Sequence, residues 1–195
     1  MLNTHIQKLI NILLQLPNLS ENNARKIALS MIRQNKIKNL SNIINTIEQK
    51  LSTCICGNID ELIQSKCNLC IKKNEDKILI ILSINDLFTI ENSGIYEGKY
   101  NIICSESINL TNLRINELIE QIQQNNTKEI ILALSYHYLS YTIEKIIIDK
   151  LHKTFEDLII TKIQTGMPAG GNIHNETEST LKAALMCRQE IDKTN

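Results

Sequence analysis

The spacing of apolar residues divides the chain into two unlike parts. In the first 50 residues, apolar side chains recur at helical spacing, which predicts amphipathic helices. The first helix covers residues 5–15 and ends before Pro17, the second begins with Ser20 as its N-cap, and the third covers about 39–50. The third helix is expected to bury an inner apolar face, whose members are Leu40, Ile43, Ile44 and Ile47.

Beyond residue 75 the pattern changes to short, continuous apolar runs separated by helical segments. Such runs are typical of strands that are buried on both faces of a parallel sheet. Alternation of strands and helices with short connections therefore predicts an α/β fold, with one compact domain from 76 to about 165. The expected strands are 77–82, 100–104, 128–134 and 158–163, the expected helices are 85–92, 113–125 and 139–153, and a closing helix is expected at about 179–190.

A cysteine-rich segment connects the two parts. Cys54 and Cys56 are followed after ten residues by Cys67 and Cys70, so four of the six cysteines fall within seventeen residues. Two pairs on two turns are typical of a tetrahedral zinc site with four thiolate ligands. The first pair is C-x-C, one residue shorter than the usual C-x-x-C, so its turn has to be tighter or shifted. Disulfides or unrelated buried cysteines are the alternatives.

Two further observations favour thiolate–metal chemistry over disulfides. The N-terminal apolar run is broken by polar residues and shows no cleavage motif, so no export signal is expected. The longest apolar runs are too short to span a bilayer, so no membrane segment is expected. A reducing, cytoplasmic location follows as an expectation.

Charge is distributed unevenly along the chain, although the net charge is +0. Residues 1–73 carry ten Lys and Arg against four acids, a net of +6, and the remainder carries eleven against seventeen, a net of −6. This asymmetry favours an anionic partner such as nucleic acid for the first third of the chain. A basic, solvated helical face is the alternative. The candidate DNA contacts are Arg25 and Lys26, with Arg33, Lys36 and Lys38 as helpers.

The segment between the first two helices resembles a helix-hairpin-helix motif. In that motif, two glycines let the hairpin backbone approach a DNA phosphate, and amides at the start of the second helix bind it. Asn18 and Ser20 stand at the glycine positions, so the hairpin is expected to persist with a weaker phosphate contact. A plain helical hairpin with surface lysines is the alternative. The retained motif residues are Leu16, Pro17, Leu19, Ala24, Ile27 and Ala28.

The order of helical hairpin, four-cysteine segment and small α/β domain resembles the family of the bacterial recombination mediator RecR. The resemblance covers nearly the whole chain and implies that the α/β part is a Toprim domain. It implies four regions: 1–50, 51–75, 76–165 and 166–195. The residues that carry it, beside the hairpin, are Cys56-Gly57-Asn58, Cys67 to Cys70, Ile90-Glu91 with Gly94, Gly98 and Tyr100, and Gly166-Met-Pro168-Ala-Gly170-Gly171.

The resemblance also implies a function and partners. Proteins of this family bind double- and single-stranded DNA without sequence preference, and act with RecO and RecF to help load RecA onto single-stranded DNA. They form homodimers or homotetrameric rings and hold one structural Zn²⁺ per chain. The loop with Gly166, Pro168, Gly170 and Gly171 is expected in the C-terminal piece that contributes to subunit contacts.

Catalytic chemistry is not expected. Catalytic Toprim domains place a Glu after the first strand and acids after the third, and these carboxylates hold magnesium. Here Leu82 and Ser83 follow the first strand, and Ser135-Tyr136-His137 follows the third. The acids usual in the RecR family are also missing, with Leu82, Leu139 and Tyr141 in their places. A protein-interaction scaffold that binds RecO with weakened DNA binding is the alternative function, and an enzyme with displaced acids is a third.

Overall fold

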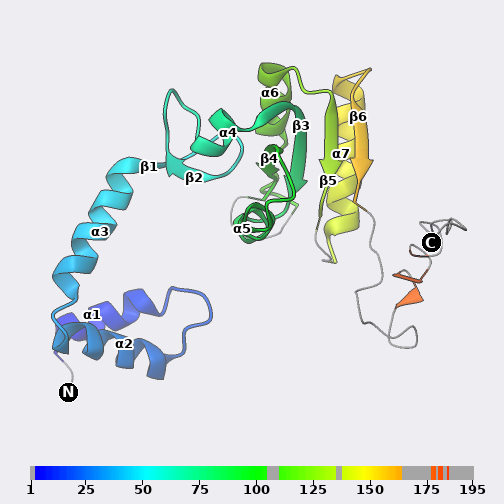
Figure 1. Cartoon of the computed structure of the whole chain (residues 1–195). Coiled ribbons are helices and arrows are strands. Elements are labelled where there is room, and N and C mark those ends of the chain that lie inside the picture. The colour runs from blue at the N-terminus through cyan, green and yellow to red at the C-terminus, as the bar shows by residue number, and fades with distance from the viewer. Residues whose placement is uncertain are drawn as a thin grey trace, which may run out of the picture. The chain divides into compact units, whose positions relative to one another are not determined.

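The computed structural model describes residues 3–104, 110–134 and 138–163, together with 177, 178, 180, 181 and 184 (Figure 1). The chain forms two compact units, Met1–Leu51 and Ser52–Asn195. The first unit is helical. The second contains the four-cysteine arm, which we define as residues 52–73, followed by a parallel sheet with helices on both faces.

The first unit contains α1 (Thr4–Leu13), α2 (Glu21–Arg33) and α3 (Ile37–Lys50). Helices α1 and α2 pack together around Ile10, which is fully buried against the small side chains of Ala24 and Ala28. Alanine at these two positions lets the helix backbones approach closely. The surrounding apolar residues that close this small core are Ile6, Leu9, Leu13 and Leu19.

The turn between α1 and α2 retains the hairpin although both glycine positions are substituted. Asn18 adopts the left-handed conformation with φ of 61°, which asparagine tolerates better than most residues. Ser20 is extended and caps α2, since its side-chain oxygen accepts a hydrogen bond from the N–H of Asn23 at 3.4 Å. The predicted helical hairpin and the predicted N-cap are therefore confirmed.

The prediction that α3 buries an inner face is wrong for the single chain. Helix α3 has no buried residue, and its apolar stripe is 39% to 57% exposed. The physical reason is that the small α1–α2 core is closed by residues of α1, α2 and the turn between them, and no residue of α3 packs into it. The exposed stripe consists of Leu40, Ile43, Ile44 and Ile47.

The arm is built from very short elements. Strand β1 (Leu51–Thr53) begins at the last residue of the first unit and forms a two-stranded sheet with β2 (Ile59–Glu61), and α4 (Asn68–Lys72) follows a tight turn. Apolar residues other than cysteine contribute little here, because the arm's buried cluster consists of its four cysteines. An arm of this kind depends on cross-links and on its neighbours for stability.

The sheet domain begins with β3 and confirms the predicted parallel α/β fold. Its strands are β3 (Asn74–Ile81), β4 (Gly98–Ile102), β5 (Glu129–Leu132) and β6 (Ile159–Lys162). They lie in the order β4-β3-β5-β6, and every neighbouring pair is parallel. This arrangement is consistent with a Toprim-like fold.

Helices cover both faces of this sheet (Figure 1). Alternate side chains of the central strand β3 point to opposite faces, so both sides of the strand are apolar. Ile78 and Ile80 pack with α6 (Ile115–Asn125) and α7 (Ser140–Thr154), whereas Leu79 and Ile81 pack with α5 (Ile84–Ser93). The continuous apolar run in the sequence is thereby explained.

Several predicted features fall outside the described residues. These include the loop with Gly166, Pro168, Gly170 and Gly171, the segment 135–137 after β5, and most of the closing helix predicted at 179–190. Among the helices that the structure does describe, none combines the length and the apolar character needed to cross a bilayer.

Candidate metal centre and nucleic-acid interface

The structure brings together the four cysteine sulfurs that the sequence singled out. Their Sγ atoms all lie within 4.8 Å of one another, and each residue is buried. The Sγ atoms of Cys54 and Cys70 are 3.8 Å apart, and those of Cys56 and Cys67 are 3.6 Å apart. A tetrahedral zinc with Zn–S bonds of about 2.3 Å has sulfur–sulfur edges of about 3.8 Å. The residues present therefore fit a four-thiolate zinc site.

Local backbone geometry positions each pair of sulfurs. In the first pair, the N–H of Gly57 donates to the carbonyl of Cys54 at 2.8 Å, which closes a tight turn, and Gly57 takes a φ of 88° that favours glycine. In the second pair, Cys67 is the N-cap of α4 and Cys70 lies in its first turn, so the two side chains share one side of the helix. The N–H of Cys67 also donates to Cys54 Sγ at 3.4 Å.

The crowding of four thiols prevents them from ionising independently. Side-chain hydrogen bonds with Cys56, Cys67 and Cys70 lower the pKa of the Cys54 thiol far below its ordinary value. The pKa of Cys70 is raised, chiefly by its hydrogen bond with Cys54. In such a cluster, a divalent cation can take over the role of the shared protons, because it compensates several thiolates at once.

Hydrogen bonds and an ion pair join the arm to the sheet domain. The N–H of Ile102 in β4 donates to the carbonyl of Cys56 at 2.7 Å. Lys73, at the end of the arm, forms an ion pair with Glu91 of α5 at 2.7 Å. Arg114, just before α6, donates to the carbonyls of Cys54 and Ile55.

Sequence reasoning did not assign a role to Arg114 or to the Lys73–Glu91 pair. Glu91 belongs to the residues that carry the family resemblance, which was a usable signal for that pair. Arg114 is separated from Cys54 by 60 positions, and nothing in its local sequence points to the arm.

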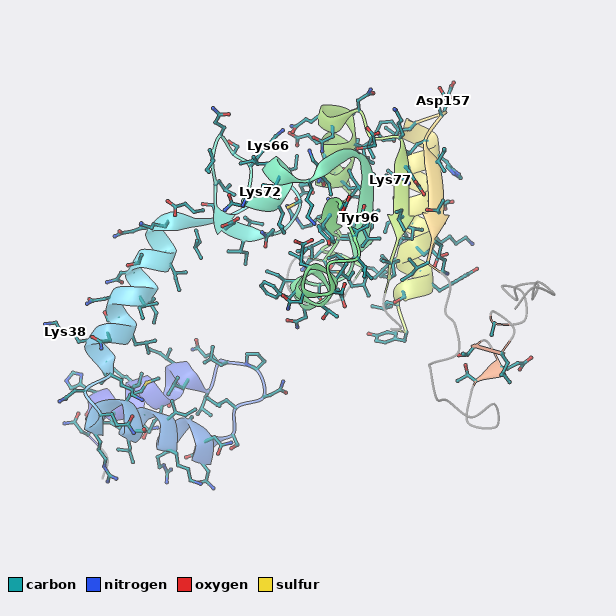
Figure 2. All side chains as sticks on the ribbon, in the orientation of Figure 1. Lys38, Lys66, Lys72, Lys77, Tyr96 and Asp157 are labelled. Atoms are coloured by element: carbon teal, nitrogen blue, oxygen red, sulfur yellow. The ribbon has the colours of Figure 1, made fainter. Side chains whose placement is uncertain are left out.

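The five basic candidates all lie on the first unit and all are exposed. Arg25, Lys26 and Arg33 lie on α2, Lys36 is the N-cap of α3, and Lys38 is in the first turn of α3 (Figure 2). Residues 1–51 carry seven Lys and Arg against two Glu, a net of +5. The unit therefore presents a positive surface of the kind that attracts phosphate.

One of these cations is already paired within the chain. Arg25 Nη2 lies 2.8 Å from the Glu21 carboxylate one helical turn away, and the two side chains are 47% and 65% exposed. An exposed pair of this kind is weak. Arg25 can therefore exchange Glu21 for a phosphate at a small cost in free energy. Within the described residues no ion pair is found for Lys26, so Lys26 has no such cost.

The position after β3, where the resemblance implies that catalytic Toprim domains carry a glutamate, is occupied here by a packed aliphatic side chain. Leu82 directly follows β3, is 0% exposed and belongs to the core between the sheet, α6 and α7. Asp86, the next acidic residue in the sequence, takes part in the capping box of α5, since it accepts hydrogen bonds from the N–H and hydroxyl of Ser83 at 2.9 Å. Leu139 packs against the same core, and Tyr141 is 74% exposed.

The fold and the site together define a class: Toprim-like α/β proteins that carry a helical hairpin and a four-cysteine arm. No family model matches the chain. Among curated proteins, it is 32% identical over 198 residues to "Recombination protein RecR" of Orientia tsutsugamushi (strain Boryong), with 96% of each chain covered. It is 33% identical over 199 residues to the protein of that name from Pelagibacter ubique (strain HTCC1062), with 97% of this chain and 96% of the relative covered. The chain belongs to the RecR family.

Proposed function

We propose that the protein is a DNA-binding recombination mediator that acts in recombinational DNA repair. As the RecR resemblance implies, it would work with RecO and RecF to help load RecA onto single-stranded DNA. The single observation that carries the DNA-binding part is the concentration of exposed cations on the helical unit, where Arg25, Lys26 and Arg33 share α2 and Lys36 and Lys38 begin α3.

Contacts of this type address the phosphate backbone. Lysine and arginine on a helical surface neutralise phosphates and release counterions, so that binding weakens steeply with salt and has no sequence preference. Lys26 and Arg33 lie seven positions apart and share one side of α2. These two, together with Arg25 on the adjoining side of the helix once it is released from Glu21, supply cations suited to a nucleic-acid backbone.

The four cysteines of the arm are proposed to hold one structural Zn²⁺ per chain. The support is the match between the sulfur–sulfur distances and a tetrahedral thiolate site, together with the burial of all four residues. When bound, the ion supplies a cross-link for an arm that lacks an apolar core. Four protein ligands leave no open coordination position, which is typical of a structural and not a catalytic site.

Self-association is proposed from the apolar stripe of α3. Four large aliphatic side chains of this helix are exposed in the single chain, and burial in a second copy would remove them from water. A homodimer or a homotetrameric ring, as the family resemblance implies, would cover them. The mass of the protein in solution, measured by light scattering, tests this proposal, and a monomer at all concentrations would contradict it.

No catalysis of its own is proposed for the protein. The support is Leu82, a fully buried aliphatic side chain at the position where catalytic Toprim domains bind magnesium. Incubation with supercoiled DNA and Mg²⁺ is expected to leave the DNA uncut and its supercoiling unchanged. Magnesium-dependent nicking or relaxation by the purified protein would overturn this proposal.

The decisive experiment for DNA binding is charge reversal on α2. The double variant Arg25→Glu/Lys26→Glu is expected to lose duplex and single-stranded DNA binding at low salt, and the wild type is expected to lose it between low and moderate salt. The matched control is Lys145→Glu/Lys150→Glu, which changes the charge equally at exposed positions of α7. Equal binding by the two double variants would refute the assignment of Arg25 and Lys26.

A second candidate function is a non-catalytic scaffold that binds RecO, with weakened DNA binding. Two observations favour it: Arg25 is paired with Glu21, and Asn18 and Ser20 replace the hairpin glycines. A wild-type protein that binds no DNA even at low salt, but retains a purified RecO, would support the scaffold over the DNA-binding mediator.

A further inference from the structure

The short C-x-C turn of the arm is held from outside by the sheet domain. Arg114 Nη2 donates hydrogen bonds to the backbone carbonyl of Cys54 at 3.2 Å and to that of Ile55 at 3.4 Å. The N–H of Ile102 donates to the carbonyl of Cys56 at 2.7 Å. Three successive carbonyls of the turn therefore accept hydrogen bonds from the sheet domain.

The guanidinium of Arg114 is fixed by its own surroundings. Its side chain is only 12% exposed, and its Nε lies 3.4 Å from the carboxylate of Glu117 in the next turn. Its backbone N–H donates to the carbonyl of Ile103 at 2.9 Å, which ties the residue to the segment after β4. Hydrogen bonds from a charged, largely buried donor are stronger than those at the surface.

The turn is shaped to admit this guanidinium. Gly57 directly follows the second cysteine of the pair, and a Cβ on it would lie 2.5 Å from Arg114 Nη1 and 2.9 Å from the carbonyl oxygen of Ile102. Its φ of 88° independently favours glycine. The same position thus provides both the conformation that the turn needs and the space that Arg114 occupies.

We propose that Arg114 is a positioning residue of the metal site. By holding the Cys54 and Ile55 carbonyls, it keeps the short turn in the conformation in which the sulfurs of Cys54 and Cys56 meet those of Cys67 and Cys70, and so slows metal release. Its charge also opposes the excess negative charge that four thiolates leave around a divalent ion. The inference rests on the proposed zinc binding, and it makes the site a joint product of the arm and the sheet domain.

The test is the rate at which the zinc-loaded, full-length protein transfers its metal to a colorimetric chelator. Removal of an outer-shell partner typically weakens metal binding by about 10- to 100-fold, so Arg114→Ala is expected to release zinc at least about tenfold faster than the wild type. Arg114→Lys keeps the positive charge but cannot reproduce the planar guanidinium that donates to both carbonyls, so its rate of zinc release is expected to lie between those of the wild type and Arg114→Ala. The matched control is Lys72→Ala, which removes an exposed positive charge two positions after Cys70 and should match the wild type (Figure 2).

A second readout separates positioning from general destabilisation. In the cobalt-loaded protein, Arg114→Ala is expected to alter the thiolate-to-cobalt absorption bands, and Arg114→Lys is expected to restore them in part, whereas a lower melting temperature alone would leave them unchanged. If Arg114→Ala does not fold, the role of Arg114 is tested by Arg114→Lys alone, which is expected to release zinc faster than the wild type. A wild-type protein without metal would refute the zinc proposal itself. A zinc-loaded wild type with wild-type release by both Arg114 variants would overturn only the role of Arg114.

Discussion

The ammonium group of Lys73 lies 2.7 Å from the carboxylate of Glu91 and joins the end of the arm to helix α5. Tyr100 of β4 donates its hydroxyl to the same carboxylate at 2.6 Å, and Lys73 also donates to the carbonyl of Tyr96 at 2.9 Å. The two charged side chains are 20% and 25% exposed. A single carboxylate therefore links the arm, a helix and an edge strand.

Substitution of Glu91 should change the acid sensitivity of folding. Burial by itself would raise the pKa of Glu91, but hydrogen bonds from Lys73 and Tyr100, together with the Lys73 charge, hold that pKa below its ordinary value of 4.5. The resulting stabilisation is fully present above about pH 4.5 and is lost as the pH falls through the depressed folded-state pKa. Glu91→Gln is expected to lower the free energy of unfolding by about 1–2 kcal/mol at pH 7.

Denaturant unfolding from neutral to acidic pH measures this effect. The difference between wild type and Glu91→Gln should shrink as the solution is acidified below pH 4.5. Glu156→Gln, at an exposed position before β6, is the control and should follow the wild type at every pH. If the difference in unfolding free energy stayed constant with pH, the contacts with Lys73 and Tyr100 would not be stabilising the ionised form of Glu91.

Removal of Glu21 should strengthen DNA binding, because this residue competes with phosphate for Arg25. Exposed helical pairs one turn apart are worth about 0.3–0.5 kcal/mol, so Glu21→Gln should gain about twofold in affinity through release of Arg25, beyond the effect of net charge. Glu48→Gln is the matched control, since Glu48 is the other acid of this helical unit and makes the same change in charge. Equal gains by both variants, measured by fluorescence anisotropy at one salt concentration, would contradict competition at Arg25.

The hairpin turn between α1 and α2 should be improved by the glycine that it lacks. Asn18 has a φ of 61°, where a residue with a Cβ other than Asn or Asp costs about 1–2 kcal/mol. Asn18→Gly is therefore expected to be more stable than Asn18→Ala by about 1 kcal/mol, with the wild type between them. Thermal unfolding of the three proteins measures the order. An alanine variant as stable as the glycine variant would show that the left-handed conformation is not required.

The tip of the arm contains two neighbouring residues in the left-handed conformation. Gln64 and Ser65 have φ of 50° and 66°, and the flanking Ile63 and Lys66 exchange two backbone hydrogen bonds of 2.9 and 3.0 Å. A two-residue hairpin turn of this type favours Asn-Gly. Ser65→Gly should stabilise the tip by about 1 kcal/mol and Ser65→Val should destabilise it by at least that amount. Amide hydrogen exchange in the arm measures both changes, and the same sign for both would refute the assigned turn.

Much of the architecture could be predicted from local sequence. The apolar run of β3 predicted a strand buried on both faces, and the structure buries Ile78 and Ile80 on one face and Leu79 and Ile81 on the other. The hairpin was predicted from Pro17 and the N-cap Ser20, because caps and breaks act within a few residues. The four cysteines could also be predicted as a group from local sequence, because each pair lies within a single turn.

Other features depend on which surfaces meet. The apolar spacing of α3 correctly predicted a helix, but periodicity identifies an apolar face without identifying what covers it, and Leu40 and Ile43 remain exposed in the single chain. The order of the strands, with β3 between β4 and β5, likewise follows from packing and not from any one strand's sequence.

In the metal centre, local sequence determines the ligands and tertiary packing determines how they are held. Four thiols at this spacing are enough to predict a zinc site, because chelation needs only two short turns that can face each other. The means by which the irregular C-x-C turn is held is not encoded nearby. Arg114 reaches the carbonyls of Cys54 and Ile55 from 60 and 59 positions away, and only the packing of the arm against the sheet domain brings that donor into place.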